Sequence, residues 1–181
     1  MYVPTKIFLT KGIGKNKEKL SSFEMALRKA DIAPLNIVRV SSIFPPHCRI
    51  ISKSQGLKYL KPGQIAHVVI SEAATNEPHR LIAASVGVAI PSDRERYGYL
   101  SEHHSYGQDD EAAGDYAEDL AASMLATILG VDFDPEKSWI EKKQIWKISK
   151  EIFKTTNVTQ SAIGDKNGWW TTVLAAAVLI P

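Results

Sequence analysis

The sequence has 181 residues, enough for one compact domain with a hydrophobic core. Its 22 basic and 20 acidic side chains leave a net charge of +2, which gives no electrostatic signature of a partner nucleic acid or an anionic membrane. The single cysteine, Cys48, excludes a disulfide within the chain and agrees with a reducing compartment. No secretory signal or membrane-spanning stretch is evident, so we expect a soluble, cytoplasmic protein.

The first elements along the chain are predicted to be a strand, a turn and a helix. We expect the strand over residues 4–10 and the turn at residues 11–14, which contain two glycines. Ser21 and Glu24 have the spacing of a capping box, in which a hydroxyl caps a helix and the glutamate bonds back to the cap. Apolar residues at helical spacing behind them predict a helix over about residues 21–31.

The rest of the chain is predicted to be rich in strands, with one long helix. β-Branched and apolar runs predict strands at residues 36–40, 47–51, 64–71, 80–90, 97–104 and 169–180. An acidic first turn and a following Gly130 bound a helix over residues 109–129. One face of that helix is expected to carry Ala113, Tyr116, Leu120, Met124 and Ile128. Residues 138–153 fit no single pattern. The absence of regular βα alternation favours a single-domain α+β fold.

Two adjacent hydroxyl side chains, Ser41 and Ser42, lie where a predicted strand runs into the Pro45-Pro46 turn. A pair of this kind commonly satisfies hydrogen bonds in a turn. The alternative is self-cleavage, in which the Ser42 hydroxyl attacks the Ser41 carbonyl and the amide becomes an ester. β-Elimination then frees the Ser41 carboxylate, and hydrolysis of the resulting dehydroalanine with loss of ammonia gives a pyruvoyl group. A constrained peptide at a functional turn favours such chemistry.

The run NIVRVSSIFPPHCRI, residues 36–50, resembles the processing site of pyruvoyl-dependent arginine decarboxylases. The resemblance covers nearly the whole chain and continues in TKGIG, SFEMALRKADI, TNEPHRLIAASVGVAIP, YGYLSEHHSYG and GDKNGWWTTVLAAAV. Together, these segments match the archaeal and bacterial branch of that family. The resemblance implies that the chain cuts itself into residues 1–41 and 42–181. It also implies that the product converts arginine to agmatine and CO2, an entry to polyamine synthesis.

The resemblance also implies roles for individual residues. Ser42 becomes the pyruvoyl group, and Ser41 ends the small chain and contributes to the substrate site. Asn36 matches an asparagine that assists cleavage and lies in the active site, where an amide can stabilise an oxyanion. Glu102 matches the acidic residue beside the pyruvoyl group and is the expected general acid that protonates the carbanion left by decarboxylation. That role requires a pKa raised by burial.

Glu24 stands at the position of the family's guanidinium-binding aspartate, and Leu27, one helical turn later, is expected to line the same pocket. A carboxylate is the natural partner of the substrate guanidinium. The additional methylene of glutamate leaves open how strictly arginine is selected. The same carboxylate would also be needed to complete the capping box with Ser21, so Glu24 has two competing interpretations.

The expected cofactor is the covalent pyruvoyl group, which forms a Schiff base with the substrate, so no pyridoxal phosphate is needed. A metal is not expected, because His103 and His104 are neighbours that face opposite sides of a strand. By resemblance, the fold is a four-layer α/β/β/α sandwich, and cleaved protomers form trimers with active sites between neighbours. The open alternatives are a histidine or lysine decarboxylase and an inactive binding module on the same scaffold.

Overall fold

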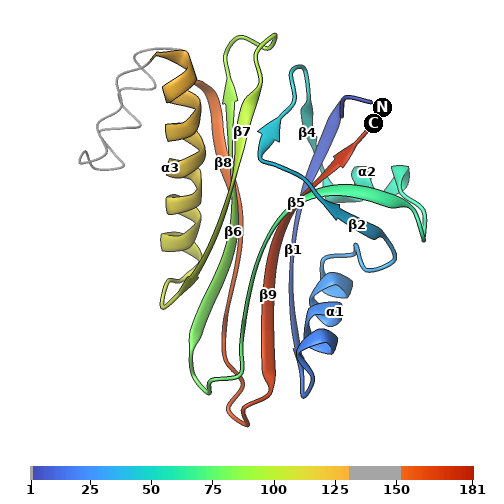
Figure 1. Ribbon diagram of the computed structural model, residues 1–181, viewed down its shortest axis with the longest axis vertical. Coiled ribbons are helices and arrows are strands. Elements are labelled where there is room, and N and C mark those ends of the chain that lie inside the picture. The colour runs from blue at the N-terminus through green and yellow to red at the C-terminus, as the bar shows by residue number, and fades with distance from the viewer. Residues whose placement is uncertain (1, 131–151) are drawn as a thin grey trace.

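A computed structural model describes residues 2–130 and 152–181, which form two β-sheets with a helix on the outer face of each (Figure 1). The first sheet has the strand order β2-β5-β9-β1-β4, and the second has the order β3-β7-β6-β8. The strands of the first sheet are β1 (Lys6–Asn16), β2 (Asn36–Arg39), β4 (Arg49–Ile51), β5 (Ile65–Thr75) and β9 (Trp170–Ile180). Those of the second sheet are β3 (Ile43–Phe44), β6 (Leu81–Pro91), β7 (Gly98–Tyr106) and β8 (Ile152–Ile163).

The two longer helices cover opposite sides of the pair of sheets. Helix α1 (Lys19–Lys29) packs on β1 and β9, and helix α3 (Asp110–Leu129) packs on β6, β7 and β8. The short α2 (Lys53–Gly56) and the 3-10 turn η1 (Leu57–Tyr59) connect β4 to β5. The predicted α+β fold is therefore confirmed. Within the described parts of the chain, no helix is both long enough and apolar enough to cross a bilayer.

Alternation of side chains along β1 explains how one strand serves two cores. Phe8 packs toward α1 together with Ile32 and Leu174, while its neighbour Ile7 packs between the two sheets with Leu100. Both faces of the first sheet are thus covered. This explains why β9 is buried almost from end to end and reads as a continuous run of apolar and small residues.

The predicted turn at residues 11–14 and the predicted capping box are both wrong. Strand β1 continues through residues 11–14, because Gly12 lets the helix backbone lie against the strand: a Cβ at Gly12 would meet the Ala26 carbonyl oxygen at 2.1 Å. Helix α1 begins at Lys19, so Ser21 lies inside it, and the N-cap residue Glu18 makes no side-chain capping bond. Glu24 is therefore not part of a helix cap.

The predicted long helix is confirmed, but the face expected from its large residues is not the one that packs. Asp109 caps α3 by accepting a hydrogen bond from the Ala112 N–H, and Gly130 ends it with a φ of 68°. The backbone of α3 lies very close to β6: a Cβ at Gly87 of β6 would lie 2.1 Å from the Ala117 carbonyl oxygen. This close approach leaves room only for small residues on the helix face that packs against the sheet. The larger residues of the predicted face are partly solvent-exposed, at 52% for Tyr116, 37% for Leu120 and 38% for Ile128. The unassigned stretch 138–153 lies almost wholly outside the described residues.

Candidate active site

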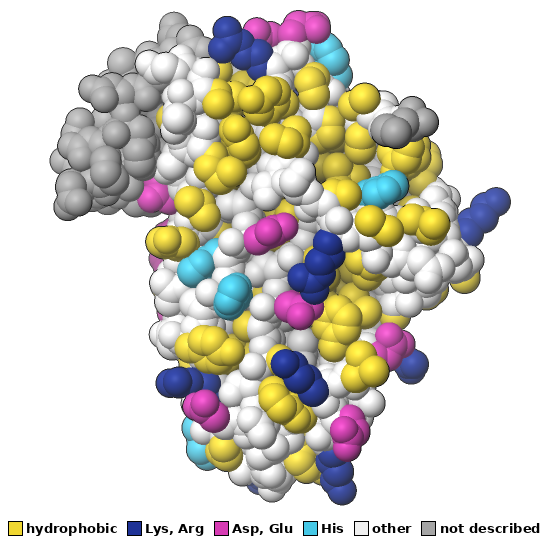
Figure 2. Space-filling model, in the orientation of Figure 1, with side chains coloured by type: hydrophobic (Ala, Val, Ile, Leu, Met, Phe, Trp, Pro, Cys, Tyr) yellow, Lys and Arg dark blue, Asp and Glu magenta, His cyan; other side chains and the backbone are white. Residues whose placement is uncertain are grey.

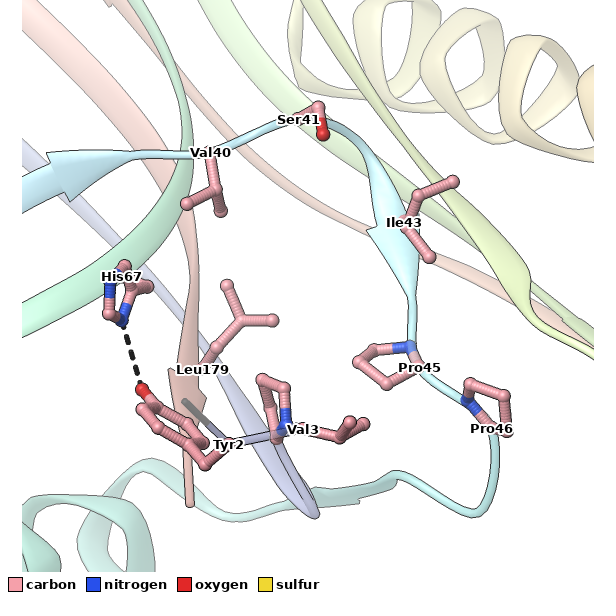
Figure 3. A pocket seen from close by; sticks show the side chains of 10 residues that line it. Tyr2, Val3, Val40, Ser41, Ile43, Pro45, Pro46, His67 and Leu179 are labelled. Carbon is pink, nitrogen blue, oxygen red and sulfur yellow. Dashed lines mark hydrogen bonds between the residues drawn. The ribbon is translucent and has the colours of Figure 1, made fainter.

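Ser41 and Ser42 form the link by which the chain crosses from one sheet to the other. Strand β2 is the edge of the first sheet and pairs with β5, while β3 is the edge of the second sheet and pairs with β7. Figure 3 shows Ser41 at the bend between the two short strands. Ser41 is exposed and Ser42 is half-buried. The Ser41–Ser42 peptide bond therefore lies at the surface but is anchored by two strands.

Backbone hydrogen bonds hold this link on both sides. The Val40 N–H donates to the Val68 carbonyl at 3.1 Å, and the Leu100 N–H donates to the Ser42 carbonyl at 2.8 Å. Within the link itself, the Ile43 N–H donates to the Ser41 carbonyl at 3.0 Å, which closes a three-residue turn centred on Ser42. The peptide bond between the two serines therefore has a fixed environment.

Glu102 lies two residues beyond Leu100 on β7, and so on the same face of that strand. Leu100 packs between the sheets, which shows that this face is turned toward the first sheet. Glu102 is exposed at the chain's surface, yet desolvation by its surroundings raises the pKa of its carboxyl. The Arg39 guanidinium acts in the opposite direction and lowers that pKa. The net effect is a pKa above that of an ordinary glutamate, at a carboxyl on the strand whose Leu100 N–H holds the Ser42 carbonyl.

Arg39 is a site residue that sequence reasoning did not identify. It ends β2, two residues before Ser41, and its Nη2 donates to Glu72 Oε2 of β5 at 2.6 Å. Its charge also acts on Glu102, so it lies near carboxylates from both sheets. In the sequence, only its position in the motif NIVRVSS indicated a role for Arg39. The carboxylates that it lies near, Glu72 and Glu102, are 33 and 63 residues away along the chain.

A pocket of about 390 Å³ opens beside Ser41 (Figure 3). Tyr2 and His67 close one side, joined by a hydrogen bond of 3.0 Å between the tyrosine hydroxyl and His67 Nδ1. The residues that line it are mainly apolar: Tyr2, Val3, Pro4, Val40, Ser41, Ile43, Pro45, Pro46, His67 and Leu179. None of these lining residues is acidic, so this pocket offers no carboxylate to a cationic substrate.

Glu24 and Leu27 lie elsewhere on this chain. Both line a second pocket, of about 730 Å³, along α1, and this pocket shares no lining residue with the pocket beside Ser41. Glu24 Oε1 accepts a hydrogen bond from Arg28 Nε at 2.9 Å, one helical turn away. The structure therefore brings Glu24 and Leu27 together but does not place them at the Ser41–Ser42 bond of the same chain.

Asn36 is also separated from the serine pair within one chain. It begins β2, where its Nδ2 donates to the Gly63 carbonyl at 2.7 Å. The five-residue step to Ser41 spans about 16 Å along an extended strand. In this chain the Asn36 amide thus serves the loop before β5.

The two adjacent histidines occupy different environments. His103 Nε2 lies 2.7 Å from Gln108 Oε1, and its ring contacts Tyr116 of α3 at 4.3 Å between ring centroids. His104, the next residue of β7, faces the other side of the strand. Among the residues with described positions, no three histidine, cysteine or acidic side chains gather in a metal-binding group.

The chain is similar to known proteins over nearly its whole length. The family profile described as "Pyruvoyl-dependent arginine decarboxylase" matches residues 6–181. A protein of Chlorobium limicola named "Probable pyruvoyl-dependent arginine decarboxylase" is 61% identical over 180 residues, which is 99% of each chain. The "Pyruvoyl-dependent arginine decarboxylase" of Nitrosopumilus maritimus is 57% identical over 178 residues, which is 98% of this chain and 97% of the relative. "Pyruvoyl-dependent arginine decarboxylase 2" of Methanosarcina acetivorans is 53% identical with the same coverage.

Proposed function

The chain belongs to the pyruvoyl-dependent arginine decarboxylase family, and on that premise we propose that it cuts itself between Ser41 and Ser42 and then converts arginine to agmatine and CO2. The products of cleavage would be residues 1–41 and residues 42–181, the latter beginning with the pyruvoyl group. We also assign the helix–sheet–sheet–helix arrangement to the four-layer sandwich type of this family.

The observation that carries the cleavage proposal is the way the Ser41–Ser42 bond is held. Ser42 lies at the centre of a closed three-residue turn, and its own carbonyl is fixed to β7 by the Leu100 N–H at 2.8 Å. A serine hydroxyl can attack the preceding carbonyl only when the two are kept in a suitable orientation, and anchoring of this kind reduces the entropy lost in reaching it. After cleavage, pairing of β2 with β5 and of β3 with β7 would keep both new ends in place.

Ser42 also fits the requirement for a pyruvoyl group, because its side chain carries the hydroxyl that elimination removes. Once formed, that group supplies a carbonyl that condenses with the substrate amine and accepts electrons as CO2 leaves. Glu102 is the proposed proton donor to the substrate carbon that CO2 leaves. Its raised pKa supports this role, since a general acid must still hold a proton near its working pH.

The guanidinium of arginine requires a carboxylate that the pocket beside Ser41 does not contain. We assign this role to Glu24 of a neighbouring copy in a trimer, with Leu27 and Asn36 contributing to the same intersubunit site. Exposed apolar side chains line both pockets that would form this intersubunit site, the one beside Glu24 and the one beside Ser41. Leu20 (79% exposed) and Met25 (43%) line the pocket of Glu24, and Val3 (67%) and Ile43 (39%) line the pocket of Ser41. Figure 2 shows hydrophobic side chains gathered over the upper part of one face. Such groups favour burial against a partner.

The decisive experiment is the intact mass of the purified chain, followed by an assay for agmatine. Two chains are expected, one ending at Ser41 and one beginning at position 42 with an N-terminus that has lost ammonia. Ser42→Ala should give one uncut, inactive chain. Ser41→Ala is the matched control and should still be cut, because the Ser41 hydroxyl takes no part in the attack. A wild-type chain that remains uncut on long incubation would refute the mechanism.

The substrate is tested separately from cleavage. Cleaved protein is incubated with arginine, lysine and histidine, and release of CO2 is compared. Arginine should be decarboxylated most efficiently, since its planar guanidinium can form paired hydrogen bonds with a carboxylate. Faster release from lysine or histidine would reassign the substrate. No release from any of them by cleaved protein would favour a binding module on the same scaffold.

A further inference from the structure

We propose that the backbone N–H of Ile43 is the oxyanion donor of the self-cleavage reaction. The proposal rests on the cleavage proposed between Ser41 and Ser42 and identifies the group that stabilises its first transition state. The donor is part of the main chain and lies one residue beyond the attacking serine. Cleavage would therefore depend on the local turn as well as on the side chains at the site.

The supporting contact is direct. The Ile43 nitrogen lies 3.0 Å from the Ser41 carbonyl oxygen. That oxygen acquires negative charge when the Ser42 hydroxyl adds to the carbonyl carbon. The 3.0 Å distance is to the oxygen of the planar carbonyl, so the N–H is bonded to this oxygen before the reaction begins. For catalysis it must remain about 2.7–3.1 Å from the oxygen as the carbonyl carbon becomes tetrahedral.

The strand ladder leaves this N–H available. Ile43 is paired with Tyr99 in the antiparallel β3–β7 ladder, and the flanking bond runs from the Leu100 N–H to the Ser42 carbonyl. A bond between the residues on either side of the pair shows that Ile43 and Tyr99 are a non-hydrogen-bonded pair. In such a pair the two opposed residues direct their own N–H groups away from the partner strand. The Ile43 N–H therefore serves the Ser41 carbonyl without weakening the attachment of β3 to β7.

The Asn36 amide, which the family resemblance assigns to this oxygen, is engaged differently in this chain. Its Nδ2 donates to the Gly63 carbonyl at 2.7 Å, and its backbone N–H donates to the Gln64 carbonyl at 2.9 Å. Among the described residues of one chain, Ile43 thus supplies a hydrogen bond to the Ser41 carbonyl that Asn36 of the same chain does not.

The reaction needs no reagent beyond water. Ser42 Oγ bonds to the Ser41 carbonyl carbon, the carbon–nitrogen bond breaks, and the hydroxyl proton passes to the freed nitrogen of residue 42. The α-proton of residue 42 then leaves as its Cβ–O bond breaks, and the electron pair of that bond remains on the Ser41 carboxylate. Water replaces the nitrogen of the dehydroalanine, which leaves as ammonia. The Ile43 N–H acts in the first of these steps only.

The test removes that N–H and follows cleavage by intact mass in freshly synthesised protein. Ile43→Pro lacks the donor and should be cut at least about 100-fold more slowly, the usual effect of losing one oxyanion donor. Ile43→Val retains the N–H and a β-branched side chain, so it should be cut at the wild-type rate. Circular dichroism and thermal melting establish that each variant is folded.

A second variant isolates the N–H, because proline also restricts the residue before it. Replacing Ile43 by its α-hydroxy acid converts the 42–43 amide to an ester, which removes the N–H without adding a proline ring. It also makes the Ser42 carbonyl a weaker acceptor for the Leu100 N–H. Scission of that ester would give chains ending at 42, which mass distinguishes from the cut after Ser41. Slow cutting after Ser41 in both the proline and the ester chain supports the proposal, because the N–H is the group that both lack. Cutting at the wild-type rate in that folded chain overturns it, whatever Ile43→Pro does. A wild-type chain that stays uncut refutes the proposed function itself.

Discussion

Arg39 ends β2 of the first sheet and Glu102 lies on β7 of the second, yet the arginine charge lowers the pKa of the glutamate carboxyl while desolvation by its surroundings raises it. Desolvation is the larger effect, so the net shift of the Glu102 pKa is upward. Arg39 is not fully available to Glu102, because it also pairs with Glu72 at 2.6 Å. The other neighbours on this face are His104, two residues along β7, and the apolar Val86 that pairs with Glu102 from β6. The protonation of Glu102 therefore depends on the contact between the two sheets.

Replacing Glu102 by glutamine should reduce kcat by orders of magnitude while leaving self-cleavage intact. The wild-type enzyme should lose turnover as the pH rises through the pKa of Glu102, because the proton that the general acid donates is then gone. Since that pKa is raised, this loss should begin at a higher pH than for an ordinary glutamate. Profiles of kcat against pH test both points. Normal turnover by Glu102→Gln would remove this residue from the mechanism.

Substitutions at Arg39 and Glu72 should move that pH profile in opposite directions. Arg39→Gln removes the charge that lowers the Glu102 pKa, so the fall in kcat should shift to higher pH. Glu72→Gln frees Arg39 from its ion pair and removes a negative charge nearby, so the fall should shift to lower pH. Both substitutions break the same 2.6 Å pair. Shifts in the same direction would therefore indicate a structural effect and contradict the electrostatic explanation.

Glu24→Gln should raise KM for arginine by about tenfold or more, since it removes a charged partner of the guanidinium. Glu24→Asp should raise KM for arginine less than Glu24→Gln does, because aspartate retains the negative charge. Arg28→Ala is the control: it removes the other member of the exposed pair on α1, a contact worth about 0.3–0.5 kcal/mol. Steady-state kinetics of cleaved protein distinguish the cases. An unchanged KM in Glu24→Gln would show that this carboxylate serves only its own helix.

Local patterns predicted most of the fold. The β-branched run at residues 36–40 and the acidic start of the helix at Asp109 identify elements whose stability comes largely from nearby residues. The errors arose where distant segments approach closely. Gly12 and Gly87 admit helix backbones against strands, so a glycine taken for a turn continues a strand, and a helix presents alanines to its sheet. No local pattern reveals which distant backbone lies above a glycine.

The site was predictable only in part, for a related reason. The resemblance predicted roles for Ser42 and Glu102 from short motifs, and pairing of β3 with β7 brings together the strands beside and containing them. Arg39 depends on Glu72 and Glu102, which only the folded chain brings near it. The Ile43 donor is a main-chain N–H, which every residue other than proline carries, so its position in a turn and not its residue type is informative.

Cys48 provides a test of whether self-cleavage leaves the inter-sheet core closed. Its side chain is fully buried between the sheets, six residues beyond Ser42, and burial raises its pKa to about 11. At pH 8 only about one thiol in a thousand would then be ionised, and the thiolate is the reactive form. Native protein should thus react very slowly with a disulfide reagent, and denatured protein should react at once.

The comparison that matters is between cleaved wild-type protein and uncut Ser42→Ala. Phe44, which is 1% exposed, and Cys48 both pack in the inter-sheet core and should hold the new N-terminal segment in place after the bond is cut. The two proteins should therefore show equally slow labelling of Cys48. Rapid labelling of only the cleaved form would mean that the segment leaves the core after cleavage. In that case the anchored geometry of Ser42 would describe the precursor and not the working enzyme.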